Sequence, residues 1–447
     1  MSAKSERLGT MPVGRLLVSM SVPMMISFFI QAMYNIVDSM FVARISEDAL
    51  TAVSIAFPIQ QLMVALGTGT GVAVNALVPR CLGQRDPDQA KRIANNAVFL
   101  SLCYTALFLL FGLFAVRPFY LLQTDHQAIV DAGCDYLTVV CCMSVGAFYG
   151  QNFEKLLIAT GNSLQSMLSQ ATGAVINLIF DPLLIFGIGP FPALGVRGAA
   201  VATVLGQVIA ALVALIMLYT KEKTIRLSLP DIRPRAATLK KIAAVAIPSA
   251  LTVGLSSVMS FGMNQILLGF STTATAVFGI WLKVQNFSCM PIFGMNNGTI
   301  PIVSYNFGAG KKDRVVAVYK LALKTALLMM AALTVVFELI PDVLLGLFSA
   351  SDNMLAIGRT ALRVLVLSLP PCAFCLIHSS AFQALNHNHY TLLISLLRQA
   401  LFSLPLAWLL SLGGNLSLVW AAIPAAEVLS CAVTWFLRRK AFTRLGL

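Results

Sequence analysis

The chain has 447 residues, of which 58% are hydrophobic and only 11% are charged, and its formal net charge is +13. A soluble protein of this size has about 25% charged residues, so the composition excludes an ordinary soluble fold. Polar stretches between the apolar segments are too short for a soluble catalytic domain.

Apolar stretches of membrane-spanning length follow one another along the whole chain. A helix needs about 20 apolar residues to cross a bilayer. Twelve stretches qualify: 15–41, 50–79, 93–117, 131–158, 163–188, 197–219, 239–270, 276–305, 315–341, 356–384, 389–411 and 416–437. We therefore predict an all-α integral membrane protein with twelve transmembrane helices.

Basic residues are distributed unequally between the two sides that these helices define. The side of the N-terminus has 23 lysines and arginines, and the loops of the other side have only Arg44, Arg117, Arg197 and Arg359. This bias predicts that both termini are cytoplasmic. Topology thus explains the basic excess, and we expect no nucleic-acid partner. The first apolar run is too long for the core of a signal peptide, so we expect it to be retained.

The two halves of the chain repeat each other at a spacing of 225 residues. The matched pairs are Pro23/Pro248, Gly69/Gly294, Gly83/Gly308 and Ala159/Ala384. Six helices per half give both halves the same orientation, so the repeat is parallel and the substrate is expected between the halves. We predict an N-lobe of residues 1–220, a cytoplasmic linker of residues 221–241 and a C-lobe of residues 242–447.

Two aspartates, Asp38 and Asp181, lie near the far ends of the first and fifth apolar segments. A charged, unpaired carboxylate at membrane depth is unfavourable by several kcal/mol, so it normally faces a cavity or a partner and has a function. Both segments cross in the same direction, which places the two acids at similar depth. Burial and a second carboxyl group both disfavour the charged form, so the pair would share a proton. A Na⁺ ion could take the place of that proton, and the sequence does not separate these two possibilities.

Polar residues recur at helical spacing in the same segments. Ser27, Gln31, Tyr34 and Asp38 follow one face of the first helix, and Ser166, Gln170, Gly173, Asn177 and Asp181 follow one face of the fifth. Thr203 and Gln207 do the same on the sixth. Three stripes in one half predict one hydrated pocket there, although such stripes also join membrane helices to one another.

Residues for a substrate cavity are less distinctive. Methionine and aromatic side chains suit an adaptable apolar cavity. We expect its lining to include Gln31, Tyr34, Met63, Met259, Met263 and Trp281. Lipid-facing helices would have almost the same composition.

Several polar residues in the second half have two interpretations. Glu427 lies mid-span and either has an ionic role or pairs with a basic group, whereas Lys283 either extends to the interface or acts as a counter-ion in the cavity. Arg398 lies near a helix end and is expected to reach the lipid headgroups. The spacing Cys372-x-x-Cys375-x-x-His378 could indicate a metal site, but no second ligand pair accompanies it, so we expect helix packing instead.

The chain lacks a phosphate-binding Gly-x-x-x-x-Gly-Lys-Ser/Thr motif. Hydrolysis of ATP is therefore not expected, and transport would depend on an ion gradient or run downhill. We expect no cofactor, and no metal other than Na⁺ at Asp38 and Asp181.

Six motifs follow one another along the chain: Tyr34-Asn-Ile-Val-Asp38-Ser, Gly83-Gln-Arg-Asp, Ala159-Thr-Gly-Asn-Ser, Asn177-Leu-Ile-Phe-Asp181-Pro182, Gly198-Ala-Ala-x-Ala-Thr203 and Ile302-Val-Ser-Tyr-Asn-Phe-Gly-Ala-Gly310. This ordered set resembles the multidrug and toxic compound extrusion (MATE) transporters over about residues 15–440. The chain is similar to the bacterial branch that includes multidrug exporters of the staphylococcal type.

This resemblance implies two pseudo-symmetric six-helix lobes in a V, exporting cationic amphipathic compounds such as drugs or dyes against H⁺ or Na⁺ entry. It implies an ion-coupling site of Asp38, Asn177, Asp181, Thr203 and Tyr136 in the N-lobe. The C-lobe acids of some family members are absent, since the seventh helix offers Asn264 and Gln265 and the tenth offers His378. We therefore expect H⁺ antiport, with Na⁺ as the alternative, by a monomer surrounded by lipid in a bacterial inner membrane.

Two other functions are alternatives for a chain of this composition. A lipid-linked oligosaccharide flippase of the same superfamily would need several cavity arginines or lysines for pyrophosphate, and only Lys283 and Arg398 are candidates. An integral membrane enzyme would need clustered histidines or acids near one interface, and His387 and His389 lie in a loop without such a cluster.

Overall fold

The structure is a computed structural model that describes residues 3–221, 225, 227, 232–348 and 352–446. The first half contains α1 (Ala3–Thr10), α2 (Val13–Ala43), α3 (Glu47–Gly83), α4 (Pro87–Phe114), α5 (Val116–Leu121), α6 (Gln127–Cys142), α7 (Val145–Ala159), α8 (Ser163–Phe186) and α9 (Val196–Lys221). The second half contains α10 (Ala236–Leu268), α11 (Thr272–Gly308), α12 (Lys312–Leu339), α13 (Pro341–Gly346), α14 (Asp352–Val366), α15 (Leu369–Ala384), α16 (Asn388–Leu396), the π-helix η2 (Leu397–Leu401), α17 (Ser403–Ser411) and α18 (Leu416–Leu445).

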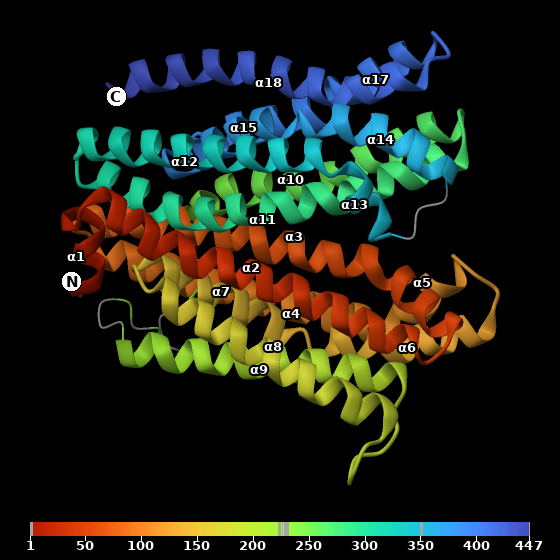
Figure 1. The fold of residues 1–447 in the computed structure, drawn as a ribbon. Coiled ribbons are helices and arrows are strands. Elements are labelled where there is room, and N and C mark those ends of the chain that lie inside the picture. Colours follow the sequence, from red (N-terminus) through yellow and green to blue (C-terminus); the bar gives the residue numbers. More distant parts are fainter. Residues whose placement is uncertain (1–2, 222–224, 226, 228–231, 349–351, 447) are drawn as a thin grey trace.

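The long helices run roughly side by side in two bundles (Figure 1). By length and composition, nine helical segments of the described chain could each cross a membrane, and eleven could if each of two bent helix pairs is one span. The remaining long helix is α11, which has 37 residues but includes a polar segment around Asn296 and Asn297. The prediction of an all-helical membrane protein with a twelve-helix layout is confirmed.

Three of the predicted spans are interrupted. The axes of α6 and α7 differ by 44°, and those of α14 and α15 differ by 41°. The span 389–411 contains η2 between α16 and α17. Hydropathy alone did not indicate these interruptions, because apolar residues continue through each of them.

The 225-residue repeat of the sequence is also visible in the backbone. Ser46 and Ser271 cap α3 and α11. Each hydroxyl accepts a hydrogen bond of 3.0 Å from the backbone N–H of the residue three positions later. Residues with positive φ also fall in matched turns: Arg85 with Gly310, and Gly161 with Asn386. The two bends, after Cys142 and Val366, lie at corresponding places in the two halves. The halves are therefore the same six-helix unit.

The two lobes meet where α2 and α3 pack against α11 and α10. At Gly83 an added Cβ would overlap the carbonyl oxygen of Tyr305, and at Gly308 it would overlap that of Arg80. These two contacts are related by the 225-residue repeat, because Arg80 corresponds to Tyr305 and Gly83 to Gly308. Small residues allow membrane helices to approach backbone to backbone, so the matched glycines follow from lobe packing.

We call the end of the bundle that holds both chain termini the basic end (left in Figure 1). There α1 crosses to the C-lobe. The side chains of Asn306, Lys311 and Arg314 donate hydrogen bonds to backbone carbonyls of α1 or of the residue after it. Asn306 donates to the carbonyl of Leu8 at 2.9 Å, and Lys311 to that of Gly9 at 2.7 Å. These bonds connect the lobes at the basic end.

The predicted linker, residues 221–241, falls partly outside the described residues. Of the part that is described, Lys221 ends α9 and residues 236–241 begin α10.

Candidate functional site

The predicted ion-coupling residues come from α2, α6, α8 and α9, and packing brings them together in the N-lobe. α8 packs along both α2 and α9. Asn177 and Asp181 are one helical turn apart on the buried face of α8, exposed to 3% and 0%. On α2, the carboxyl group of Asp38 lies within hydrogen-bonding reach of that of Asp181. Two acids that are 143 positions apart in the sequence therefore form one pair.

Asn177 connects this pair to α9. Its amide nitrogen Nδ2 donates to Asp181 Oδ1 at 3.2 Å and to Thr203 Oγ1 at 3.3 Å. Both amide hydrogens are thus used, one within α8 and one across to the neighbouring helix. With both amide hydrogens used, the amide oxygen Oδ1 of Asn177 has no hydrogen-bond donor among the described residues.

Three oxygen atoms of this cluster are buried without a hydrogen-bond donor among the described residues: Asp38 Oδ1, Asn177 Oδ1 and Asp181 Oδ2. A buried acceptor without a partner is unfavourable by about 1–3 kcal/mol. A proton or a monovalent cation among these oxygens would relieve that cost. The oxygen atoms available as ligands, from carboxylate, amide and hydroxyl groups, fit either ion.

Two tyrosines border the acids. Tyr136, on α6, is 3% exposed and accepts a hydrogen bond of 3.0 Å from Gln60 Nε2 on α3. It lies within electrostatic range of Asp38. Tyr34, one turn before Asp38 on α2, lies within range of Asp38 and Asp181. The five predicted coupling residues are therefore all in one region.

One acid of this region was missed in the sequence. Glu154 on α7 is 8% exposed, and its Oε2 accepts a hydrogen bond of 2.6 Å from Gln170 Nε2 on α8. The neighbouring Lys155 donates to Asn297 Oδ1 on α11, across the lobe boundary. Gln170, in the predicted polar stripe, was the only sequence signal for a partner.

The six residues expected to line a substrate cavity have different surroundings. Gln31 is exposed and Tyr34 is half-buried. Met63 belongs to a hydrophobic cluster of the N-lobe, whereas Met259, Met263 and Trp281 belong to a larger cluster that includes the C-lobe. Trp281 and Met263 are fully buried. The structure does not bring these six side chains together.

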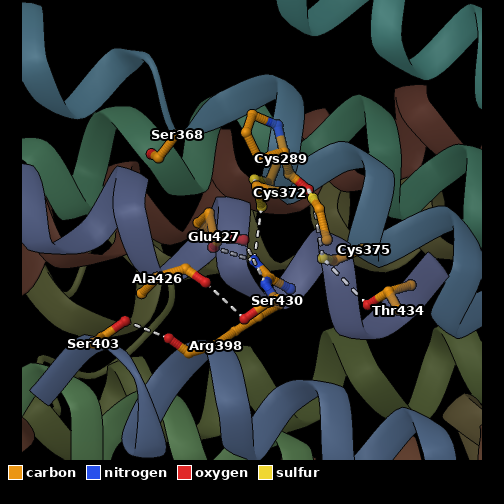
Figure 2. A network of polar contacts seen from close by, with 12 residues as sticks. Cys289, Ser368, Cys372, Cys375, Arg398, Ser403, Ala426, Glu427, Ser430 and Thr434 are labelled. Carbon is orange, nitrogen blue, oxygen red and sulfur yellow. Dashed lines mark hydrogen bonds and ion pairs between the residues drawn. The ribbon is translucent and has the colours of Figure 1, made fainter. Parts of the chain in front are cut away.

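In the C-lobe, Arg398 and Glu427 form a buried ion pair (Figure 2). Arg398 Nε donates to Glu427 Oε2 and Nη2 donates to Oε1, both at 2.7 Å, and the two side chains are 8% and 6% exposed. Arg398 Nη2 also lies 2.9 Å from Cys372 Sγ. The expectation that Arg398 reaches the headgroups was therefore wrong, because η2 and the start of α17 turn it inward to an acid on α18. Glu427 takes the pairing role.

The residues of the Cys372-x-x-Cys375-x-x-His378 motif do not converge. Cys372 faces Cys289 with an Sγ–Sγ distance of 4.0 Å, and Cys375 faces Cys431 at 3.7 Å. His378 Nε2 is 2.6 Å from the hydroxyl of Tyr319. Among the described residues, no three histidine, cysteine or acidic side chains form a metal-binding group.

Lys283 has an exposed side chain, and its Nζ lies 5.3 Å from the ring centroid of Phe348. This arrangement is a cation–π contact, which stabilises an exposed pair by about 0.5–1 kcal/mol. Of the two interpretations of Lys283, its exposure favours extension toward the interface, where its partner is an aromatic ring.

Comparisons with known proteins agree with this architecture. The family model described as MatE matches residues 23–183 and 248–409. The chain is 26% identical to a protein named FAD transporter from Shewanella oneidensis, over 96% of this chain and 95% of that protein. It is 25% identical to multidrug export protein MepA from Staphylococcus saprophyticus, over 92% of this chain and 90% of that protein.

Solved structures show the same fold. One is described as an outward-facing conformation of a multidrug resistance MATE family transporter of the MOP superfamily, with a TM-score of 0.93 and 24% identity over 100% of this chain and 99% of that chain. Another is a MOP superfamily transporter from Pyrococcus furiosus whose description reports a binding pocket of reverse polarity, with a TM-score of 0.90 and 23% identity over 100% of both chains. Since the family model covers most of both halves, the chain belongs to the MatE family and is a MATE transporter rather than an enzyme.

Proposed function

We propose that this transporter exports small cationic amphipathic molecules in exchange for H⁺, with Asp38 and Asp181 as the coupling pair. The observation that carries the proposal is the group of buried oxygens without donors, at Asp38, Asn177 and Asp181. The aspartate pair binds H⁺ in one conformational state of the transport cycle and releases it in another.

A shared proton suits the pair for an electrostatic reason. Two carboxyl groups within hydrogen-bonding reach cannot both be ionised in a low-dielectric site without strong repulsion. One proton between them removes the repulsion and provides the missing donor, so the pair titrates as a unit. Sodium is the alternative ion, because it could use the same oxygens together with Thr203 Oγ1.

The position of the pair supports access from the end opposite the basic end. Gly294 on α11 approaches α2 at Met25, where an added Cβ would lie 2.5 Å from the Met25 nitrogen. Asp38 is 13 positions further along α2, or about 20 Å at about 1.5 Å per residue. The closest lobe contacts therefore lie between Asp38 and the basic end. If the basic end is cytoplasmic, as the charge bias predicts, this arrangement suits release to the outside.

The cationic substrate class is supported by the buried acids and by the relative named multidrug export protein MepA. A second candidate is a flavin dinucleotide, because a relative of similar coverage is named FAD transporter. The two candidates differ in charge. The N-lobe acids favour a cation, and the buried arginine of the C-lobe is already neutralised by Glu427.

Several further expectations belong to this proposal. Both termini would be cytoplasmic, the membrane would be a bacterial inner membrane, and the transporter would act as a monomer. The division into residues 1–220, 221–241 and 242–447 also stays a prediction.

The test is transport by purified protein in liposomes. An outward-directed exchange of ethidium should follow an imposed pH gradient in Na⁺-free buffer, and FAD should not compete. Asp38→Asn and Asp181→Asn should each abolish coupled transport while the protein elutes as a folded species. Asp131→Asn is the matched control, because Asp131 forms only an exposed ion pair with Arg117 at 3.5 Å, and such pairs contribute little.

Three results would revise the proposal. Transport that requires a Na⁺ gradient would replace the proton as coupling ion. Exchange of FAD with no exchange of ethidium would replace the substrate class. Full coupled transport by both Asn variants would remove the aspartate pair from the mechanism.

A further inference from the structure

An apolar cavity of about 350 Å³ lies on the N-lobe between α4, α7 and α9, away from the ion-coupling site. It is lined by Val98, Tyr149, Phe153 and Leu215, among other apolar residues. Its volume is within the range of about 300–1,000 Å³ that is usual for sites of small organic ligands. The cavity is therefore large enough to receive part of an apolar molecule.

The mouth of this cavity faces out of the bundle. Three of its lining residues have large exposed fractions: Val145 with 43%, Leu212 with 53% and Tyr219 with 49%. Leu227 and Ile232 form another wall, and Tyr219 donates a hydrogen bond of 2.7 Å to the carbonyl of Leu227. In a transporter that spans the membrane, such a mouth opens to lipid.

A second cavity, of about 180 Å³, is lined by residues of α4 that lie nearer the basic end than Val98 does. Its lining is polar: Asp88, Lys91, Arg92, Asn95, Asn96 and Arg235. With three basic residues and one acidic residue, this lining has an excess of two positive charges. Arg92 and Arg235 are both exposed.

The two cavities share two elements of structure. Asn95 and Val98 are one turn apart on α4, so the polar lining continues into the apolar lining on the same helix. Ile232 and Arg235 do the same in the segment before α10. That segment is fixed to α4 by the backbone N–H of Arg235, which donates to Asn96 Oδ1 at 2.9 Å.

We infer that these two neighbouring cavities together are a binding site for an anionic phospholipid of the surrounding membrane. An acyl chain occupies the apolar cavity and the phosphate-bearing headgroup occupies the polar one. The charge matches, because a basic pocket between helices at the membrane surface attracts anionic headgroups. The order of the two cavities matches as well, since the polar one lies nearer the end of the bundle. This site is separate from the proposed transport path and does not depend on the identity of the exported substrate.

The experiment measures lipid binding to the whole delipidated protein in detergent by native mass spectrometry. Phosphatidylglycerol and phosphatidylcholine with the same acyl chains are added in equal amounts. The wild type should retain phosphatidylglycerol in clear preference. Basic residues near a membrane surface each contribute about fivefold to this attraction, so Arg92→Gln with Arg235→Gln should weaken phosphatidylglycerol binding about 30-fold.

Three controls separate this site from general basic attraction. Lys320→Gln with Lys440→Gln removes two exposed charges from the C-lobe and should leave binding unchanged. Arg92→Lys with Arg235→Lys should retain the preference, which separates charge loss from misfolding. Inorganic phosphate at the lipid concentration should not compete, because it leaves the apolar cavity unfilled.

Equal binding of the two lipids would overturn the inference, as would an equal loss in the C-lobe variant. Competition by inorganic phosphate would reduce the polar cavity to a simple anion site and would overturn the lipid assignment too.

Discussion

Glu427→Gln should destabilise the folded protein more than almost any other single substitution of a polar residue in the C-lobe. Arg398 and Glu427 share two hydrogen bonds of 2.7 Å, and both side chains are nearly inaccessible, with exposed fractions of 8% and 6%. The substitution leaves a buried guanidinium without its counter-ion, which costs about 3–5 kcal/mol.

The double variant Arg398→Met with Glu427→Leu should be close to the wild type in stability, or more stable. Replacing both partners removes the desolvation of two ions as well as their attraction, and the outcome is often neutral or favourable by about 1–4 kcal/mol. The measurement is unfolding in mixed micelles by titration with a denaturing detergent. It compares the wild type, Glu427→Gln, the single variants Arg398→Met and Glu427→Leu, and the double variant. A coupling free energy above about 2 kcal/mol would agree with the geometry. A cost below about 1 kcal/mol for Glu427→Gln, with additive single effects, would refute it.

Two further substitutions examine the coupling site and the lobe contact. Thr203→Val should lower H⁺-driven transport about tenfold, because an Asn177 hydrogen then loses its acceptor at a cost of about 1–3 kcal/mol; Thr203→Ser should restore it, and equal rates for the two would contradict the bond. Gly83→Val should separate the lobes at the basic end, so that a maleimide reagent labels the buried Cys81 faster than in the wild type. Gly279→Ala, where an added Cβ meets nothing within 4 Å, should not change the labelling, and slow labelling of both variants would argue against the close approach.

The apolar stretches predicted all twelve spans, because each has a long apolar run whatever its neighbours are. Eleven of them are long and apolar enough in the structure as single helices or bent pairs, and α11 is different. It packs against both α2 and α3, and Asn297 there receives hydrogen bonds from Asn75 and Lys155 of the other lobe. Its polar side chains therefore report a protein environment, which the apolar stretch 276–305 did not reveal.

The shared face of Asn177 and Asp181 was predictable because periodicity acts within one helix, whereas their role in coupling stays a prediction. Asn177 and Asp181 share a face by spacing alone, and Asp38 repeats the pattern at similar depth. The Arg398–Glu427 pair was not predictable, since it depends on how η2 and α18 pack. Glu154 was hidden for a related reason, because only packing shows that Gln170 faces it.

The reciprocal approach of Gly83 to Tyr305 and of Gly308 to Arg80 has a mechanical consequence. Each lobe contributes the same surface to the contact, so a rotation that lifts one crossing also lifts the other. If the lobes separate at the basic end, we therefore expect both contacts to open together. In a bilayer, separated helix surfaces that become covered by lipid do not meet the hydrophobic penalty that soluble proteins meet, so tight backbone contact can be combined with a modest cost of separation. Gly83 and Gly308 would thus allow both tight packing and separation of the two lobes.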